Sequence, residues 1–569
     1  MDADASAGLR AHKPTFAELF APKLMTVLRE GYGWPAFRAD AVAGLTVAVV
    51  ALPLSMAIAI GCGLTPEKGL YTAIVGGFII SAIGGSRFQI GGPAGAFIAL
   101  IATIVERQGY DGLVLATFMA GLMMVGIGFL RLGTYVKYIP FPVMVGFTAG
   151  IAVIISASQV KELLGLDMVH EPAALVPKVA AIWSDLYTTR PAAIALALVA
   201  LALIVGLKRV RPKWPGMLIA IGVTAALTYL LHLDVATIGS RYGGVPRTLP
   251  LPQLPVFDLA RMRDLLPDAV AIALLGSIES LLSAVVADGM TGRRHRSNCE
   301  LVAQGAANMA AVTFGGMCVT GTIARTATNI RAGARGPVSG MLHALYVLLF
   351  MAVAAPLAAY IPLASLGAVL AVVAWNMAEK TAFAALLRSR GDAAVLLVTF
   401  LLTIFADLTI AIGAGVTLSA FLFLHRMAET VEIETGRTAT AEDVADTTGS
   451  ARAPYDAVGQ AGDIAIYRIS GAFFFGAVST VSQVLERIGE HPKMLVLDFS
   501  DVPLVDSTAT KALESFVHKL HQSGTCIYFA GADRDVRRTL LAGGLREPLV
   551  RYASAVEDAV QSWRCNVPA

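Results

Sequence analysis

Two stretches interrupt the hydrophobic sequence of this chain in the same way: Gly85-Ser-Arg-Phe-Gln-Ile-Gly-Gly-Pro-Ala-Gly-Ala-Phe97 and Gly315-Gly-Met-Cys-Val-Thr-Gly-Thr-Ile-Ala-Arg-Thr-Ala-Thr-Asn329. In each stretch a glycine recurs after six positions, and a helix-starting sequence follows. A membrane-spanning helix needs about 20 apolar residues, which neither stretch supplies without a break. Non-helical backbone at membrane depth is tolerated only where protein buries it or a cavity hydrates it. Matching interruptions in the two halves of a chain therefore indicate the binding site of a secondary transporter.

The composition is that of a membrane protein. Hydrophobic residues make up 56% of the 569 residues and charged residues 15%, and the mean hydropathy is +0.68. The net charge of +3 is too small to indicate a nucleic-acid partner. The five cysteines are scattered, so we expect neither a disulfide framework nor a metal site. The sequence has no GxxxxGK[ST] loop and no nucleophile–base set, so we expect no cofactor, no ATP-driven step and no enzymatic activity.

Fourteen apolar runs are expected to enter or cross the membrane. They lie near residues 40–61, 69–84, 93–105, 112–130, 139–158, 190–207, 214–232, 265–288, 299–313, 321–332, 338–358, 362–378, 392–406 and 408–425. The interruptions fall in the third run of each half, as two inverted sets of seven would place them. Basic residues cluster in alternate connections, for example at 208–213, 293–296 and 380–390. The positive-inside rule makes these connections, and with them both termini, cytoplasmic.

The chain changes character after Arg426. We expect four parts: a cytoplasmic N-terminal segment over residues 1–38, a transmembrane domain over 39–426, a polar and acidic linker over 427–460, and a soluble domain over 461–569. Within the soluble domain, strands are predicted near 464–469, 472–475, 494–499 and 525–529, and helices near 478–488, 508–521, 535–543 and 554–563. Strands that alternate with helices indicate a small open α/β domain.

Several motifs resemble the SulP family of sulfate-permease-like anion transporters. They are Asp40-Ala-Val-Ala-Gly-Leu-Thr-Val47, Pro53-Leu-Ser-Met-Ala57, Gly69-Leu-Tyr71, Gly92-Pro93, Asn298-Cys-Glu-Leu301 and Arg325-Thr-Ala-Thr-Asn329. The tail resembles a STAS domain, which anti-sigma-factor antagonists also contain, with Leu497-Asp-Phe-Ser-Asp-Val-Pro-Leu-Val-Asp-Ser507-Thr-Ala as its signature loop. Within the family, residues 275–292 and Val373-Ala-Trp-Asn-Met377 are most similar to the bacterial C4-dicarboxylic acid uptake (DauA-like) branch.

The resemblance implies an α-helical polytopic membrane protein of the bacterial inner membrane. It implies fourteen transmembrane segments in a seven-plus-seven inverted repeat, with a core domain that moves against a gate domain in an elevator-like manner, usually within a dimer. Many sulfate- and chloride-handling relatives carry Gln after the proline of the first span and an aromatic residue four positions later. Leu54 and Ile58 stand there in this chain, and Ala324 replaces the serine that often precedes the arginine of the tenth span. Compared with those relatives, this chain has fewer polar and aromatic side chains to line a substrate site.

The residues around the two half-helix starts are the candidate substrate ligands. They are Ser55, Gly92, Pro93, Ala94, Gly321, Thr322, Ala324, Arg325 and Thr326. Pro93 suits the first turn of a helix, and Thr320 or Thr322 can cap the second half-helix. Each start exposes unpaired N–H groups and about half a positive charge, so two starts together would hold an anion. In the alternative interpretation, the glycines only permit close helix packing.

Arg325 and Glu279 are the charged candidates inside apolar segments. Arg325 lies one turn into the second half-helix, where the helix dipole disfavours a cation unless an anion is beside it. It is expected to bind a substrate carboxylate or sulfate, the alternatives being a structural ion pair or snorkelling. Glu279 is the candidate for proton coupling: ionised it would pair with Arg325, and protonated it would free Arg325 for the anion. The alternative is a permanent salt bridge that fixes helix positions.

Weaker candidates complete the set. Gln89, Asn308 and Thr320 have side chains that can hydrogen-bond either a substrate or a neighbouring helix. In the tail, Ser507 follows Asp506 in a strand-to-helix loop, and the resemblance implies phosphorylation there, as in the antagonist relatives. A plain N-cap is the alternative role. A cytoplasmic protein is the expected partner of the tail.

These observations predict a secondary active transporter of small anions. The first choice is proton-coupled symport of C4-dicarboxylates (succinate, fumarate, aspartate) across the inner membrane. Transport of sulfate or bicarbonate, and an anion channel of the same fold, are the alternatives, and a sensor that signals through the STAS domain is a third. The expected partners are the anion, protons, membrane lipid and a second copy of the chain.

Overall fold

The computed structural model describes residues 15–134, 140–168, 172, 174–211, 214–406, 408–429, 432–434, 464–474, 492–522 and 524–566. The chain forms two compact units, Met1–Val416 and Thr417–Ala569. Most of the expected linker (427–460) and the helix predicted near 478–488 lie outside the described residues.

The first half of the membrane unit begins with two short helices. It continues with a series of helices that is broken once, at the extended segment β1. Its elements are α1 (Phe16–Phe20), α2 (Lys23–Arg29), α3 (Trp34–Gly61), α4 (Pro66–Tyr71), the π-helix η1 (Thr72–Gly76), α5 (Gly77–Ile83), β1 (Gly91–Gly92), the 3-10 turn η2 (Gly95–Phe97), α6 (Ile98–Phe129), α7 (Phe141–Leu164), α8 (Leu175–Ser184), η4 (Leu186–Thr188), α9 (Pro191–Val210) and α10 (Gly216–Leu230).

The second half repeats this pattern of long helices with one break. Its elements are α11 (Ile238–Tyr242), α12 (Leu259–Asp264), α13 (Leu266–Thr291), α14 (Ser297–Thr313), β2 (Thr320–Gly321), α15 (Ile323–Arg331), α16 (Val338–Ala358), α17 (Leu363–Met377), α18 (Lys380–Leu386), α19 (Arg390–Phe405) and α20 (Leu408–Glu429). Among the described residues, eight helices have the length and apolar composition needed to cross a membrane.

Each of the fourteen apolar runs coincides with helical structure in the part of the chain that the structure describes. The runs near 93–105 and 112–130 share the label α6, but they are two helical segments on either side of a bend, as the two runs predicted. The bend is at Gly109, whose φ of 70° and ψ of −176° are not helical. A positive φ is accessible to glycine at little steric cost, so the bend occurs at the glycine between the two runs.

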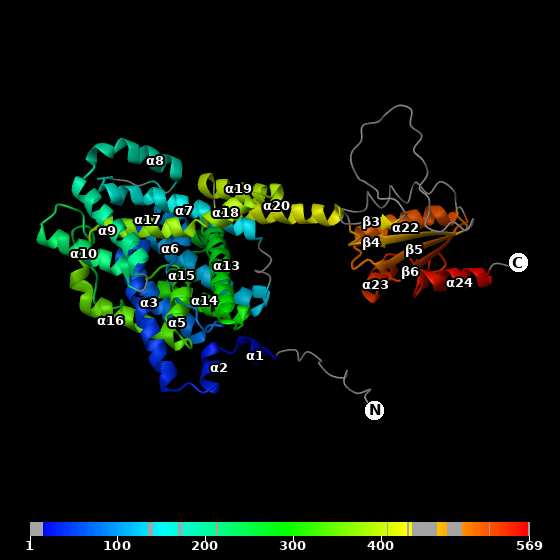
Figure 1. The fold of residues 1–569 in the computed structure, drawn as a ribbon, viewed down its shortest axis with the longest axis horizontal. Helices are drawn as coiled ribbons and strands as arrows, with labels where there is room; N and C mark the ends of the chain where they lie inside the picture. Colours follow the sequence, from blue (N-terminus) through cyan, green and yellow to red (C-terminus); the bar gives the residue numbers. More distant parts are fainter. Residues whose placement is uncertain are drawn as a thin grey trace. The chain divides into compact units, whose positions relative to one another are not determined.

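The membrane helices pack into two groups (Figure 1). In the first group, α3, α5, α6, α13, α14, α15 and α16 contact one another, and in the second, α7, α9, α10, α17 and α19 do so. The groups meet where α17 and α10 pack against α3. Each group therefore combines elements from both halves of the sequence, as an inverted repeat requires.

The soluble unit has a five-stranded sheet in the order β3 (Glu432–Glu434), β4 (Ile464–Ser470), β5 (Met494–Asp501), β6 (Cys526–Ala530) and β7 (Arg551–Ala553). β3 is antiparallel to β4, and the other neighbours are parallel. Helices α22 (Ser507–Gln522) and α23 (Arg534–Ala542) cover one face with apolar side chains, and α24 (Val556–Asn566) covers the other.

Three strand assignments in the soluble unit differ from the prediction. β3 and β7 were not predicted, because each has only three residues and no apolar run. The strand predicted near 472–475 is reduced to a single bridge between Phe473 and Val505 in the described residues.

Candidate functional site

The two interruptions lie side by side in the middle of the first helix group. β1 pairs with β2 in antiparallel register, with Gly91 opposite Gly321 and Gly92 opposite Thr320. Segments more than 220 residues apart thus form one short two-stranded sheet, and their backbone groups satisfy one another away from water. The antiparallel pairing brings the two half-helix starts together, as the sequence predicted.

Side chains extend this pairing on both sides. The backbone N–H of Ile90 donates to Thr326 Oγ1 (3.2 Å), and the N–H of Thr322 donates to the Ile90 carbonyl (3.0 Å). Asn308 pairs with Val319 in the manner of a third strand, donating to its carbonyl (2.7 Å) and accepting from its N–H (2.9 Å). Thr326 and Asn308 therefore hydrogen-bond the backbone of the site, and their contact with substrate stays a prediction.

One face of α13 forms hydrogen bonds to both interruptions. Gln89 Nε2 donates to the Ser280 hydroxyl (3.2 Å), and Thr320 Oγ1 donates to the Gly276 carbonyl (3.1 Å). Ser283 Oγ donates to Thr326 Oγ1 at 3.1 Å. Positions 276, 280 and 283 share one face of the helix because they are three or four residues apart. The neighbouring face is left free to line a cavity.

Two glycines are required by close approach of side chains. A Cβ at Gly92 would overlap Nη1 of Arg325, and one at Gly321 would overlap the side-chain amide of Gln89. Neither glycine lines the cavity described below. These glycines therefore permit close packing, as the alternative interpretation held. At Gly92, the group that packs closely is the guanidinium of Arg325.

The half-helix starts differ from the prediction in detail. Pro93 is not in the first helical turn; the chain stays extended through Ala94, and the helix begins with the 3-10 turn at Gly95. Thr322 occupies the N-cap position of α15, but its hydroxyl donates to the Ile90 carbonyl (3.3 Å) and makes no capping bond. The first N–H groups of α15 therefore have no side-chain cap, and the positive end of the helix dipole stays available.

Arg325 reaches back from α15 to the first interruption. Its Nη2 donates to Ser55 Oγ (3.1 Å) on α3 and to the Pro93 carbonyl (3.4 Å). The side chain is only 2% exposed, and Nε and Nη1 have no hydrogen-bond partner among the described residues. A buried charge that lacks partners is costly, so this guanidinium is poised for an anionic ligand.

A cavity of about 460 Å³ lies between the two helix groups and reaches Arg325. Of the predicted site residues, Pro93, Ala94, Glu279, Thr322, Ala324 and Arg325 line it. Ser55, Gly92, Gly321 and Thr326 lie behind this lining. The sequence did not identify the opposite wall, which Phe147, Met217 and Met377 help to form. Nothing in the local sequence of α7, α10 or α17 distinguishes a cavity residue from a lipid-facing one.

Glu279 lines the same cavity but does not form the ion pair with Arg325 that was predicted for its ionised form. No salt bridge or hydrogen bond joins it to Arg325 among the described residues, and its Oε2 is buried without a partner. Arg325 instead uses neutral oxygens, those of Ser55 and Pro93. A permanent structural salt bridge between the two residues is therefore not what this structure contains.

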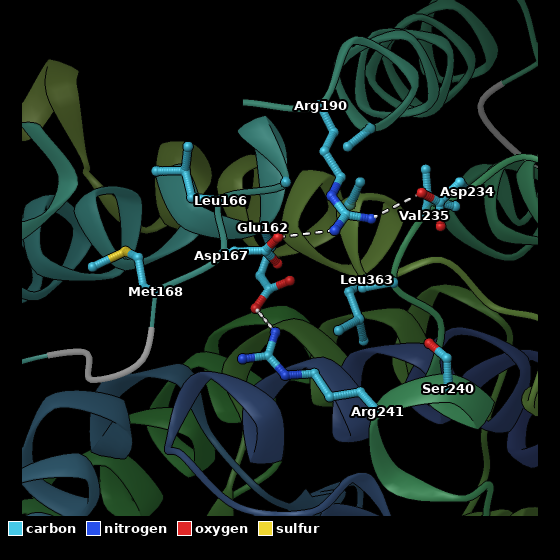
Figure 2. Close-up of a pocket in the computed structure, with 14 residues that line it drawn as sticks. Glu162, Leu166, Asp167, Met168, Arg190, Asp234, Val235, Ser240, Arg241 and Leu363 are labelled. Carbon is cyan, nitrogen blue, oxygen red and sulfur yellow. Dashed lines mark hydrogen bonds and ion pairs between the residues drawn. The ribbon is translucent and has the colours of Figure 1, made fainter. Parts of the chain in front are cut away.

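A second cavity of about 390 Å³ contains charged groups that neutralise one another. Figure 2 shows Arg190 between Asp167 (2.8 Å) and Asp234 (3.4 Å), and Arg241 beside Glu162 (3.0 Å). Each guanidinium has a carboxylate partner and is 37% exposed, so neither resembles the buried and incompletely bonded Arg325. These ion pairs connect α7, α9 and the segment around α11, and the central cavity remains the candidate anion site.

Ser507 is exposed at the first position of α22 in the soluble unit. The helix is capped by the preceding residue, because Asp506 Oδ1 accepts a hydrogen bond from the N–H of Ala509 at 2.7 Å. The alternative role predicted for Ser507, that of N-cap, therefore belongs to Asp506.

Comparison with known proteins agrees with this architecture. Residues 37–399 match the sulfate permease family, and residues 457–559 match the STAS domain. The chain is 41% identical to "Putative sulfate transporter YvdB" of Bacillus subtilis, over 91% of this chain and 95% of the relative. It is 31% identical to "Bicarbonate transporter BicA" of Synechocystis, over 88% and 89%.

Solved structures give the same fold. The transmembrane domain of a cyanobacterial bicarbonate transporter BicA matches with a TM-score of 0.61 and 31% identity, over 67% of this chain and 98% of that one. Murine Slc26a9 matches with a TM-score of 0.82 at 19% identity, over 99% and 97%. YvdB is named for sulfate, BicA for bicarbonate and Slc26a9 for anions, and none of them distinguishes the dicarboxylate branch. The chain belongs to the sulfate permease family: it is a multi-pass membrane anion transporter with a C-terminal STAS domain, and not an enzyme.

Proposed function

We propose that this chain is a secondary active carrier that binds its anion at Arg325 and moves it by an elevator-like displacement of the first helix group against the second. The observation that carries the proposal is the buried guanidinium, two of whose nitrogens have no partner in the described part of the chain, beside the paired half-helix starts. The cavity that it faces lies between the two helix groups. A binding site at such a boundary changes its access when one group moves.

The anion is held by one full positive charge and by backbone groups. Arg325 offers Nε and Nη1, and the uncapped start of α15 adds N–H groups and dipole charge. Ser55 and the Pro93 carbonyl orient the guanidinium from behind. Gly92 leaves room for it, and Gly321 and Thr326 keep the paired strands in place.

The proposed substrate is a C4-dicarboxylate. A cavity of about 460 Å³ is in the range that holds small organic ligands, and most of its lining is hydrocarbon. Bicarbonate and sulfate are the second candidates, favoured by the names of the relatives BicA and YvdB. Competition of radiolabelled succinate uptake by fumarate, bicarbonate and sulfate distinguishes them. A stronger competition by bicarbonate or sulfate than by fumarate would reject the dicarboxylate.

Proton coupling is assigned to Glu279. It lines the cavity from α13, close in sequence to the residues that hold both interruptions, and its Oε2 has no partner among the described residues. An ionised carboxylate in the cavity opposes the entry of an anion, and a protonated one permits it. Protonation and anion binding are therefore linked, which is the requirement for symport.

The carrier is proposed to lie in the bacterial inner membrane as a homodimer with both termini in the cytoplasm. The rim of the cavity includes the exposed residues Phe141, Asn376 and Glu379, and Glu379 directly precedes the basic cluster at 380–390. The positive-inside rule places this rim on the cytoplasmic side, so the conformation is open inward. The STAS domain, over residues 461–569, would bind a cytoplasmic protein, and Ser507 is its exposed candidate for phosphorylation.

The test compares Glu279→Gln with Glu379→Gln in proteoliposomes under an imposed pH gradient. Both glutamates line the cavity, but Glu379 is at its exposed rim. We expect Glu279→Gln to lose proton-driven accumulation while anion exchange continues, and Glu379→Gln to keep both. Undiminished accumulation by Glu279→Gln would end the assignment.

The same assay distinguishes a carrier from an anion channel. Accumulation against a gradient that an uncoupler abolishes identifies a carrier, whereas flux that only dissipates gradients identifies a channel. Deletion of residues 440–569 tests the tail: full transport without it would make the STAS domain regulatory, and the membrane unit a complete carrier.

A further inference from the structure

We propose that the cavity selects a carboxylate that binds as a singly charged anion and carries an apolar carbon body, in preference to inorganic oxyanions. The inference rests on the proposed function, since it requires that Arg325 binds the transported anion. It adds that monocarboxylates with short alkyl chains are ligands, and that a dicarboxylate binds with one of its carboxyl groups protonated.

The cavity has a single site of positive charge. Among the described residues, Arg325 is the only basic residue that lines it, and Glu279 and Glu379 line the same space. Nε and Nη1 of Arg325 can donate to the two oxygens of one carboxylate group. A doubly charged anion would leave its second charge opposite no cation of the described lining, between hydrocarbon walls and in a cavity that Glu279 also lines, which is a costly arrangement.

The threonine hydroxyls of the cavity do not add donors. Thr148 donates to the Met144 carbonyl (3.0 Å), Thr322 to that of Ile90 (3.3 Å), and Thr328 to that of Ala324 (2.8 Å). A hydroxyl has one proton, so these three can only accept further hydrogen bonds. Apart from Arg325, the side-chain amide donor in the lining is Asn376, which is at the exposed rim. The oxygens of sulfate or bicarbonate that face away from Arg325 and from the start of α15 would lose water without gaining side-chain donors.

The remaining wall is hydrocarbon from both helix groups. Leu54 and Ile58 of α3 and Leu275 and Ile278 of α13 face Phe147 of α7 and Met217 of α10 across the cavity. Ile58, Leu275, Ile278 and Phe147 are 2–8% exposed, so their apolar surface is largely protected from bulk water. A carbon chain that leaves water for such a wall gains about 0.8 kcal/mol per methylene, roughly a fourfold gain in affinity.

The arrangement explains why Leu54 and Ile58 are apolar. Both line the cavity and are four residues apart on one face of α3. Ser55, next to Leu54 and three residues before Ile58, contacts Arg325. One segment of α3 thus orients the guanidinium through its hydroxyl and presents carbon to the rest of the ligand. An inorganic oxyanion would use the first feature and gain nothing from the second.

The test measures ligand affinity in the purified full-length protein, by thermal stabilisation and by competition in proteoliposome uptake. The probes are acetate, propionate, butyrate, valerate and hexanoate at one pH, with sulfate, bicarbonate and uncharged hexanol for comparison. We expect the apparent Kd to fall about fourfold per added methylene. All of the carboxylates from butyrate upward should compete better than sulfate or bicarbonate, and hexanol should have no effect.

Two variants test which residues cause the dependence of affinity on the length of the alkyl group. Leu54→Gln adds a donor and removes hydrocarbon, so it should flatten the dependence on chain length and improve the relative affinity for sulfate. Arg325→Gln should abolish binding of the whole series. The wild-type series requires no variant, so it decides the question even if a substituted protein does not fold.

The outcomes separate this inference from the proposed function. Affinity that is independent of chain length, or tightest for sulfate or bicarbonate, would overturn the apolar-body selectivity and leave the anion carrier standing. Equal stabilisation by hexanol would also overturn it, because the alkyl group of the ligand would then bind without a carboxylate. If no anion binds or is transported, the proposed function itself fails.

Discussion

The two interruptions have the same backbone course but contribute different chemistry to the cavity. The first brings Pro93, Ala94 and Gly95, none of which carries a polar side chain, and the second brings Thr322 and Arg325. Arg325 crosses to the first interruption and donates to the Pro93 carbonyl. In the proposed mechanism, the paired strands therefore set where the anion binds, whereas Arg325, which has no counterpart in the first interruption, supplies the charge.

The largest effect is expected for Arg325, the charged residue that distinguishes the second interruption from the first. Arg325→Gln removes the only cation among the described residues that line the cavity, and loss of one member of a buried charge pair costs about 2–5 kcal/mol. We expect anion affinity to fall at least about 30-fold, measured by ligand-dependent thermal stabilisation and uptake. Arg331→Gln, six residues further along α15, is the matched control and should leave affinity unchanged. Equal losses in both variants would place the binding charge elsewhere.

The next largest effect is expected at Gly92, where the first interruption leaves room for the guanidinium of Arg325. Gly92→Ala adds a Cβ that would overlap Arg325 Nη1, and overpacking of this kind costs about 1–3 kcal/mol. We expect affinity to fall about tenfold. Gly95→Ala is the control, because its Cβ would lie 3.2 Å from Met377 Sδ and 3.6 Å from Ile155 Cδ1, both flexible ends of side chains. A tolerated Gly92→Ala would show that the guanidinium does not need this position.

Asn308 supports the second interruption, and its loss is expected to affect stability more than binding. Asn308→Ala removes the two hydrogen bonds to Val319 and leaves its buried backbone groups without partners, at a cost of about 1–3 kcal/mol. The melting temperature should fall while KM for the anion changes little. Asn376→Ala, at the exposed rim, should not change the melting temperature. A selective rise in KM with normal stability would instead favour the substrate contact first considered for Asn308.

The smallest effect is expected at Ser55. Ser55→Ala removes one acceptor from Arg325, which keeps the Pro93 carbonyl at 3.4 Å. One such hydrogen bond contributes about 1 kcal/mol, so affinity should fall about fivefold. Ser156→Ala serves as the control, since that hydroxyl donates to the Ala152 carbonyl of its own helix. No difference between the two variants would mean that Ser55 does not orient the guanidinium.

Much of the site was predictable because it depends on residues near the interruptions. Broken hydrophobic runs indicated both half-helix starts, and Arg325 and Glu279 stood out as charges in apolar sequence. The supporting residues were harder to assign. Thr326 and Asn308 are polar and close to the breaks, but only the folded structure distinguishes a residue that bonds backbone from one that faces a ligand.

The partner of Arg325 could not be predicted. An arginine and a glutamate in apolar segments suggest an ion pair, whereas the guanidinium bonds Ser55, which is 270 residues away. The choice depends on which face of α3 and of α13 points toward α15. Helical periodicity orders residues around one helix, but it does not define the rotation of that helix against another.

The linear order of residues was therefore sufficient for the membrane class, the apolar runs, the two breaks and the α/β tail, since each depends on hydrophobic pattern within one segment. The pairing of Gly91 with Gly321, the absence of an ion pair at Glu279 and the hydrocarbon wall opposite Arg325 depend on segments far apart in the chain. Such contacts arise only when helices pack, because shape and the need to satisfy buried polar groups then select one arrangement among many that the same local patterns allow.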